Sequence, residues 1–171
     1  MRPAYRSRIN RRASPWRTVS IPIASVVLGS MTPLLPFIAS APVLPPFGLL
    51  MLLGWRMLRP GLWPIWCGVP FGMLDDIFSG QPIGSAVLIW SIILISMDLI
   101  DQRYLWRNYW QDWLLAALFI IFALLGGLAI NNLLINDVDA ITVVPQIILS
   151  VFAYPLTLRL VARLDHIRLG R

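Results

Sequence analysis

The stretch WLLAALFIIFALLGGLAINNLLI, residues 113–135, contains no charged side chain. A helix needs about 20 apolar residues to cross the hydrocarbon core of a bilayer, which is roughly 30 Å thick, and this stretch is long enough to do so. The rest of the chain is similar, since 58% of its 171 residues are hydrophobic, 13% are charged and the mean hydropathy is +0.74. A water-soluble core of this size could not hide so much apolar surface. The sequence therefore predicts an all-α integral membrane protein.

Further apolar segments lie on both sides of this stretch, and together they predict a six-transmembrane-helix bundle. The expected spans are Val19–Ile38, Val43–Leu58, Leu62–Phe78, Ile83–Ile100, Trp113–Ile135 and Ala140–Val161. The second and third spans are short and contain several prolines, which interrupt helices. Kinks or a shallow re-entrant path are therefore alternatives to straight crossings, and a four-span bundle is the main structural alternative.

The positive charge of the chain falls in alternate gaps between these spans. Cationic side chains that flank short hydrophobic spans are retained on the cytoplasmic side of a membrane. The arginines precede the first span, or lie at the end of the second, fourth and sixth spans or beyond it: Arg2, Arg6, Arg8, Arg11, Arg12, Arg17, Arg56, Arg59, Arg103, Arg107, Arg159, Arg163, Arg168 and Arg171. Both termini are thus expected in the cytoplasm, as basic tails of residues 1–18 and 162–171 around a transmembrane domain of residues 19–161.

The sequence pI of about 10.7 would suggest nucleic acid as a partner of a soluble protein. Here membrane topology and attraction to anionic headgroups of the lipid bilayer account for the arginines, so no nucleic-acid binding is expected. The chain has one cysteine, Cys67, and one histidine, His166. It therefore offers no internal disulfide, no thiolate metal site and no catalytic dyad. We expect neither an enzyme nor a bound metal or cofactor.

The strongest chemical signal is GMLDDIFSGQPIG, residues 72–84, where the third span ends and the fourth begins. An acidic side chain near a membrane needs partners, so Asp75 and Asp76 are candidate functional residues. Adjacent residues point about 100° apart on a helix, and these two cannot face the same neighbour. The candidate structural or partner-binding motif consists of Asp76, Ser79, Gly80, Pro82 and Gly84. In one interpretation, the Asp76 carboxylate accepts hydrogen bonds from the free N–H groups that begin the fourth span.

The connection DQRYLWRNYWQDW, residues 101–113, joins spans four and five. If it is helical, its aromatic residues fall on one face and its charged residues on the other. That distribution is typical of a helix lying at the membrane surface. The expected interfacial anchors are Trp106, Tyr109, Trp110 and Trp113, and a docking surface for a partner is the alternative interpretation.

In the motif Asp76, Ser79-Gly80, Pro82 and Gly84, the chain resembles the rod shape-determining protein MreD family of bacterial inner-membrane proteins. Its basic N-terminus and its last span, with Pro145 and Tyr154-Pro155 before the final arginines, are also similar to that family. The resemblance implies a non-enzymatic scaffold subunit of the cell-elongation machinery, which supports lateral peptidoglycan synthesis and cell shape. It also implies association with MreC, a single-span protein, and through it with MreB, RodA and a class B penicillin-binding protein.

The family is similar in fold to the six-helix S-components of energy-coupling-factor transporters. A vitamin- or metal-binding subunit of such a transporter is therefore the alternative function. A carrier needs several polar groups that converge on one ligand. The outer side of the predicted bundle offers only a few Asp residues with Asn131, Asn132 and Asn136, which favours the scaffold.

Overall fold

Helices make up all the regular secondary structure in the residues that the computed structural model describes, which are 15–34, 44–103, 108–134 and 138–169. The α-helices are α1 (Pro15–Ser30), α2 (Phe47–Leu58), α3 (Gly68–Ser79), α4 (Ser85–Arg103), α5 (Tyr109–Leu134) and α6 (Val144–Leu169). Short 3-10 helices precede or follow them at Thr32–Leu34 (η1), Ile65–Cys67 (η2) and Ala140–Val143 (η3). The predicted all-α architecture is confirmed.

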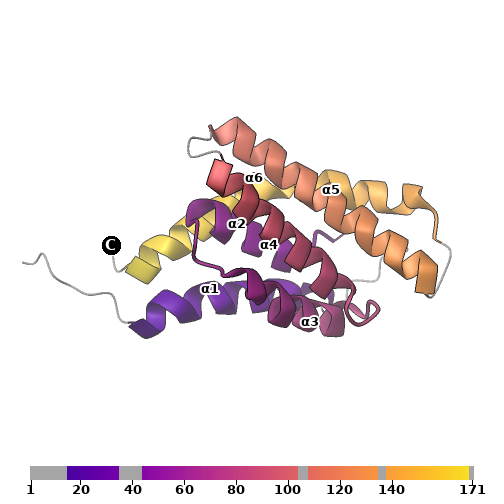
Figure 1. Ribbon diagram of the computed structural model, residues 1–171, viewed down its shortest axis with the longest axis horizontal. Coiled ribbons are helices and arrows are strands. Elements are labelled where there is room, and N and C mark those ends of the chain that lie inside the picture. Colours follow the sequence, from indigo (N-terminus) through magenta and orange to yellow (C-terminus); the bar gives the residue numbers. More distant parts are fainter. Residues whose placement is uncertain (1–14, 35–43, 104–107, 135–137, 170–171) are drawn as a thin grey trace, which may run out of the picture.

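The short helix α2 lies at the centre of the bundle (Figure 1). Each of its residues from Gly48 to Arg56 is buried, and it packs against α1, α5 and α6. A helix that is apolar on all sides, such as this one, is expected inside a bundle and not on its surface. The centre of the core is therefore formed by α2, with Leu50, Leu52, Leu53 and Trp55 fully buried.

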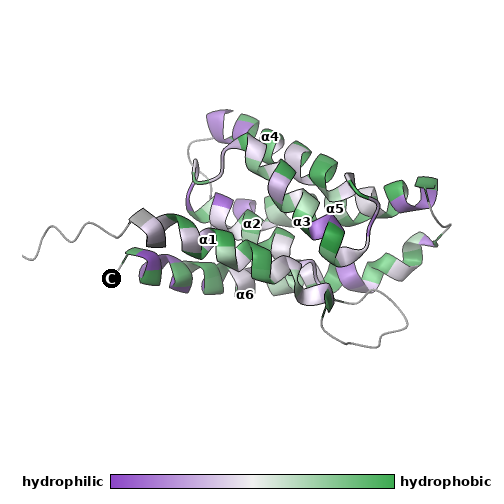
Figure 2. Cartoon of the chain, turned by 90° about the horizontal axis from the view of Figure 1, so that it is seen from below, coloured by the Kyte–Doolittle hydropathy of each residue, from purple (hydrophilic) through white to green (hydrophobic). Residues whose placement is uncertain are grey.

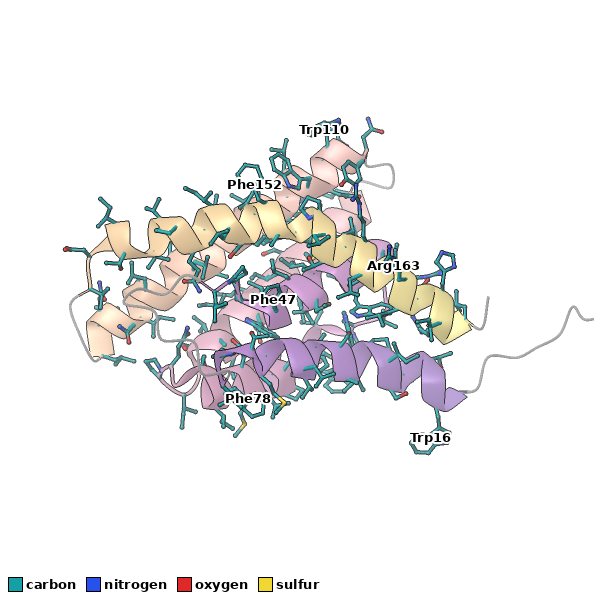
Figure 3. The ribbon with its side chains drawn as sticks, turned by 180° about the vertical axis from the view of Figure 1, so that it is seen from behind. Trp16, Phe47, Phe78, Trp110, Phe152 and Arg163 are labelled. Atoms are coloured by element: carbon teal, nitrogen blue, oxygen red, sulfur yellow. The ribbon has the colours of Figure 1, made fainter. Side chains whose placement is uncertain are left out.

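The outer faces of the surrounding helices are apolar. Figure 2 shows hydrophobic residues along the helices, with many of the strongly hydrophilic residues near the helix ends. Large apolar side chains such as Phe152 of α6, which is 72% exposed, point away from the bundle (Figure 3). Soluble monomers rarely expose an apolar surface of this extent, and lipid is the environment that suits it. Helices α4, α5 and the segment Ala140–Leu169 are long and apolar enough to cross a membrane.

The first three helices are shorter than the sequence suggested. Helix α1 ends at Ser30 instead of Ile38, α2 starts at Phe47, and α3 starts at Gly68, after a non-helical segment and the short helix η2. Prolines explain these limits, since they lack the N–H group and clash with the preceding turn of a helix. Pro45 and Pro46 delay α2, and Pro60 and Pro64 delay α3. With 12 residues each, α2 and α3 are only about 18 Å long. Six membrane crossings therefore remain a prediction.

The connection between α4 and α5 also differs from expectation. Residues Asp101–Arg103 belong to the end of α4, and Tyr109–Trp113 form the first turns of α5, which runs without interruption to Leu134. Residues 104–107 lie outside the described part of the chain. The described parts of this connection thus extend α4 and α5 and do not form a separate surface helix. The length of α5 explains the difference, since an apolar helix of 26 residues is longer than a bilayer crossing requires and has room for an aromatic first turn.

Helices α3 and α4 form the most extensive helix pair, because two glycines let them approach closely. Gly68 and Gly72 are four residues apart and lie on one face of α3. A Cβ atom added to Gly72 would lie 2.6 Å from the backbone of Val87, and one added to Gly68 would lie 2.9 Å from Ser91. Small residues at this spacing are typical of tightly packed membrane helices.

We predict that Gly72→Ala destabilises the fold by about 1–3 kcal/mol, because the new methyl group overlaps the backbone of α4. Gly126→Ala is the matched control. Its Cβ would meet only the end of the Ile89 side chain, at 3.5 Å, so this variant should be neutral or gain up to about 1 kcal/mol of helix stability. Thermal unfolding can be followed with a thiol-reactive dye, since the single cysteine, Cys67, is buried. Equal melting temperatures of the two variants would contradict the close packing.

Candidate functional site

The candidate motif forms a helical hairpin in which Asp76 of α3 caps the start of α4. The carboxylate is 1% exposed and accepts three hydrogen bonds. The Gly84 N–H donates to Oδ2 at 2.7 Å, and the Ala86 N–H and the Ser85 hydroxyl both donate to Oδ1 at 2.8 Å. These donors include N–H groups that a helix leaves free in its first turn. The positive end of the helix dipole of α4 also favours a carboxylate at this place.

The turn between the helices needs the glycines of the motif. Gly80 follows α3 with a φ of +67°, a left-handed conformation that costs glycine little, and its N–H donates to the Asp76 carbonyl at 3.1 Å. Gly84 has a φ of +101°, and the Ser85 N–H donates to the Pro82 carbonyl at 3.0 Å. The buried Ser79 hydroxyl has no hydrogen-bond partner in the described part of the chain. The structure thus brings together Asp76, Gly80, Pro82 and Gly84 and leaves the Ser79 side chain outside this network.

The two adjacent acids of the motif face different neighbours. Asp76 contacts α4, whereas the half-buried Asp75 lies near Ser30 at the end of α1. This arrangement agrees with the angle of about 100° between successive helix positions. Asp75 adds no hydrogen bond to the start of α4 in the described residues.

A second polar cluster lies at the opposite end of the bundle, which we call the basic end: α1 begins there, and α2, α4 and α6 end there (Figure 1). The side chain of Arg56 is only 4% exposed, and its Nη2 atom lies 3.1 Å from carboxylate oxygens of both Asp98 and Asp101. Removing one member of such a buried ion pair is costly, because it leaves charge without a partner in a poorly solvated place. Arg56 therefore ties α2 to α4.

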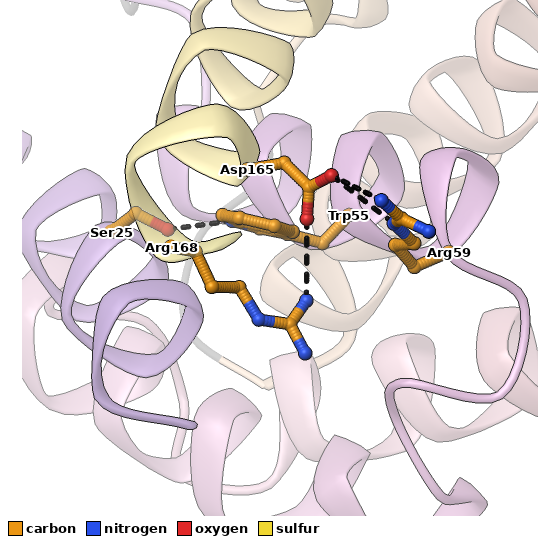
Figure 4. A network of polar contacts seen from close by, with 5 residues as sticks. All are labelled: Ser25, Trp55, Arg59, Asp165 and Arg168. Carbon is orange, nitrogen blue, oxygen red and sulfur yellow. Dashed lines mark hydrogen bonds and ion pairs between the residues drawn. The ribbon is translucent and has the colours of Figure 1, made fainter. Parts of the chain in front are cut away.

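A neighbouring network ties α1, α2 and α6 together (Figure 4). Asp165 of α6 accepts a hydrogen bond from Arg59 at 2.6 Å and forms an ion pair with Arg168 at 3.4 Å. The Arg168 guanidinium lies 5.8 Å from the ring centre of Trp55, whose indole N–H donates to the Ser25 hydroxyl of α1 at 2.7 Å. The pKa of Arg59 is raised above its usual value, first by the hydrogen bond to Asp165 and then by the charge of that carboxylate.

Sequence reasoning did not identify these ion pairs. It treated Arg56, Arg59 and Arg168 only as topology signals. The sequence nevertheless contained a signal for these pairs. The expected spans two, four and six end on the same side of the membrane, and their ends carry both arginines and aspartates: Arg56, Arg59, Asp98, Asp101 and Asp165.

The expected aromatic anchors lie at the basic end, as far as they are described. Tyr109 and Trp110 are 58% and 70% exposed in the first turn of α5, and Figure 3 shows Trp110 pointing away from the bundle. Trp113 is half-buried and stacks edge-on against Trp110 at 6.0 Å. Trp106 lies outside the described residues. Exposed aromatic rings at a helix end suit the headgroup level of a bilayer, so the anchor role remains a prediction.

The described residues contain no group of three or more His, Cys, Asp or Glu side chains that could hold a metal ion. The buried acids are held by hydrogen bonds or by arginines, and Cys67 is a lone buried thiol. In both polar clusters, the hydrogen bonds and ion pairs therefore hold helices to one another.

Comparison with known proteins gives one match. The model of the family described as rod shape-determining protein MreD matches residues 11–164. No curated protein and no solved structure matches the chain.

Replacing Asp76 should test the hairpin. Asp76→Ala leaves three donors without their acceptor and should cost at least about 2 kcal/mol, because hydrogen bonds to charged groups contribute roughly 1.5–3 kcal/mol each. Asp76→Asn should be intermediate, since its amide oxygen can still accept from Ala86 and Ser85 while its NH₂ group faces the Gly84 N–H. Ser79→Ala is the control in the same motif and should change stability by less than about 0.5 kcal/mol. If Asp76→Ala unfolds at the same temperature as Ser79→Ala, the carboxylate does not hold the hairpin.

Arg56→Ala should destabilise the bundle by about 1.5–3 kcal/mol, because it removes the buried cation shared by Asp98 and Asp101, although Asp98 is 39% exposed and keeps its hydrogen bond from Gln102. Arg56→Lys keeps the charge and should recover part of this loss. The control is Arg103→Ala, at an exposed arginine that forms no ion pair in the described residues and should have an effect within about 0.5 kcal/mol. Thermal unfolding in detergent at low and high salt measures all three. Similar losses for Arg56→Ala and Arg103→Ala would show that the buried pairs add no stability.

Proposed function

Because the chain belongs to the rod shape-determining protein MreD family, we propose that it is a non-enzymatic scaffold subunit of the bacterial cell-elongation complex. Membership of this family indicates that the protein takes part in determining rod shape and that it is a membrane protein. The proposal adds that the chain binds a single-span protein of the MreC type and supports lateral peptidoglycan synthesis. Through that partner it would join MreB, RodA and a class B penicillin-binding protein, directly or indirectly.

We place the protein in the bacterial inner membrane with both termini in the cytoplasm. The positive-inside rule supports this orientation, since the basic end carries the starts or ends of four helices together with their arginines. In this arrangement residues 19–161 form the transmembrane domain, and α2 and α3 complete six crossings with the help of the non-helical segments beside them. Such segments are tolerated at membrane depth where protein covers them or water reaches them. Between α2 and α3, Trp63 is buried whereas Pro60, Gly61 and Pro64 are exposed, so protein covers only part of this segment.

The internal use of polar groups supports a scaffold over a carrier. The Asp76 carboxylate accepts hydrogen bonds from the start of α4. Asn132 donates to and accepts from the backbone of Val138, and Gln146 donates to the Leu44 carbonyl. A carrier with the S-component fold would need such groups free to converge on a vitamin or a metal ion. In contrast, the long outer faces of α5 and α6 are apolar and exposed, which suits contact with another membrane helix or with lipid. We infer that Asp76 serves partner binding only by fixing the shape of the hairpin.

Depletion of this chain in its native rod-shaped cells tests the function. Cells should become round, and expression of the tagged wild-type chain should restore rods and co-purify a single-span membrane protein. The Arg103→Ala variant should rescue as well as the wild type, since its substitution disturbs no described ion pair. Normal cell shape after depletion would contradict the proposal. Co-purification of a transporter ATPase, with a vitamin requirement in depleted cells, would establish the carrier instead.

A further inference from the structure

The second half of α6 carries charged side chains on two sides. Successive helix positions are about 100° apart, so Arg159, Arg163 and His166 lie on one side of the helix. All three are exposed, and we call them the outer cationic stripe. Asp165 and Arg168 lie on the other side, where they form an ion pair with each other at 3.4 Å (Figure 4). Within the described residues, only this inner side takes part in the ion pairs of the bundle.

The outward side of α6 that carries this stripe is apolar in the first half of the helix. Ile148, Phe152 and Leu156 follow one another at the i, i+4 spacing, and each is more than half exposed. Together with the outer cationic stripe they occupy a sector of about 80° around the helix. The outward side therefore changes from apolar to cationic after Leu156, and Figure 3 shows Phe152 and Arg163 in these two halves of α6.

The change falls at the depth where a bilayer passes from acyl chains to headgroups. Helix α6 has 26 residues and is about 39 Å long, whereas the hydrocarbon core is roughly 30 Å thick. Measured along the helix from Val144, its first residue, Arg159 lies at about 22 Å and Arg163 at about 28 Å. In the orientation proposed above, α6 begins at the outer surface and brings both arginines to the cytoplasmic edge of the core. Long arginine side chains can extend from such a position to the headgroups.

The bundle supplies no anion to these two arginines. Within the described residues, Arg159 and Arg163 form no ion pair, and Asp165, the acid of α6, is held on the inner side by other arginines. The two aspartates near the end of α4 lie against Arg56. A cation that borders the hydrocarbon core is costly unless an anion accompanies it. The charge of Arg159 and Arg163 is thus left to be met from outside the bundle.

Two arginines one helical turn apart are suited to a phosphate group. Their Cβ atoms are about 5–6 Å from each other, so both side chains can reach one ligand. Each guanidinium can donate two parallel hydrogen bonds to phosphate oxygens. A phospholipid offers a phosphate at this depth and also an acyl chain for the apolar half of the same side of α6. Its two parts therefore match the two parts of the surface.

We propose that Arg159 and Arg163 bind the phosphate of one anionic phospholipid of the cytoplasmic leaflet, with an acyl chain along Phe152 and Leu156. The choice of leaflet rests on the orientation proposed above, whereas the binding does not depend on the partners of the scaffold. Charge distinguishes this occupant from others. A second copy of the chain that used the same side of α6 would bring the same arginines into contact, and a zwitterionic lipid would bring a cationic choline group toward them.

Native mass spectrometry of the purified full chain tests the proposal with two lipids that differ only in headgroup, dioleoylphosphatidylglycerol and dioleoylphosphatidylcholine. The wild type should retain one phosphatidylglycerol at least about tenfold more tightly than phosphatidylcholine, because two arginines attract its net negative charge. Arg163→Gln should lower this preference at least about threefold, and replacing both Arg159 and Arg163 by Gln should remove it. Arg103→Gln is the matched control and should keep the wild-type preference, because it removes one exposed arginine from the same end of the bundle but from α4.

Protection of Cys67 from a thiol-reactive dye verifies that each variant is folded. Equal retention of both lipids by the wild type overturns the proposal, and so does a wild-type preference in the variant that lacks both arginines. Equal losses in Arg163→Gln and Arg103→Gln also overturn it, since they would show that net charge and not this site selects the lipid.

A different occupant would give a different result. If the wild type shows no lipid preference, and a membrane protein co-purifies with it but not with the variant that lacks both arginines, the arginines bind an acidic partner and the proposal is overturned. The lipid preference itself is measured on the purified chain, without cell shape or a partner as a readout. Its failure is therefore distinct from a failure of the scaffold function.

Discussion

A charged side chain in a helical bundle surrounded by lipid needs partners inside the protein, because the hydrocarbon core offers neither water nor hydrogen bonds. The buried Arg56 meets this requirement with Asp98 and Asp101, and the buried Asp76 meets it with the first turn of α4. Each solution joins two helices, so satisfying the charge also fixes how those helices pack. The polar residues of this apolar chain therefore specify its arrangement, while the apolar residues supply its packing surface.

The prolines that shorten α2 and α3 have different consequences for the two helices. Because α2 is enclosed by α1, α5 and α6, its 12 residues need not match the thickness of the bilayer. Helix α3 and the preceding η2 lie at the surface, where Trp66, Val69 and Met73 are exposed, and the late start of α3 leaves part of α1 uncovered. Hydrophobic mismatch at such a surface is relieved by lipid adaptation or by a bound component. The open half of α1 is thus a direct result of Pro60 and Pro64 in the sequence.

Features set by the local sequence could be predicted, and features set by distant contacts could not. The long apolar runs predicted α4, α5 and α6 to within several residues at each end, since helix periodicity and length are local properties. The donors for Asp76 were expected among the free N–H groups that begin the fourth span, because every helix start has such groups, and the Gly84 and Ala86 N–H groups are among them. The spacing of Gly68 and Gly72 was a usable signal for close packing that was missed. In contrast, the partners Arg56 and Asp98 are 42 residues apart and Arg59 and Asp165 are 106 apart. A single sequence does not reveal such pairings.

The ion pairs divide the arginines of the basic end into two groups. Arg56, Arg59 and Arg168 are held by Asp98, Asp101 and Asp165, so much of their charge is compensated within the bundle. Arg103, Arg159 and Arg163 are exposed and form no ion pair in the described residues. Only charge that is not compensated internally can act strongly on lipid headgroups or on the membrane potential. The first group therefore joins the helices to one another, whereas the charge of the second group remains available for the cytoplasmic orientation proposed above.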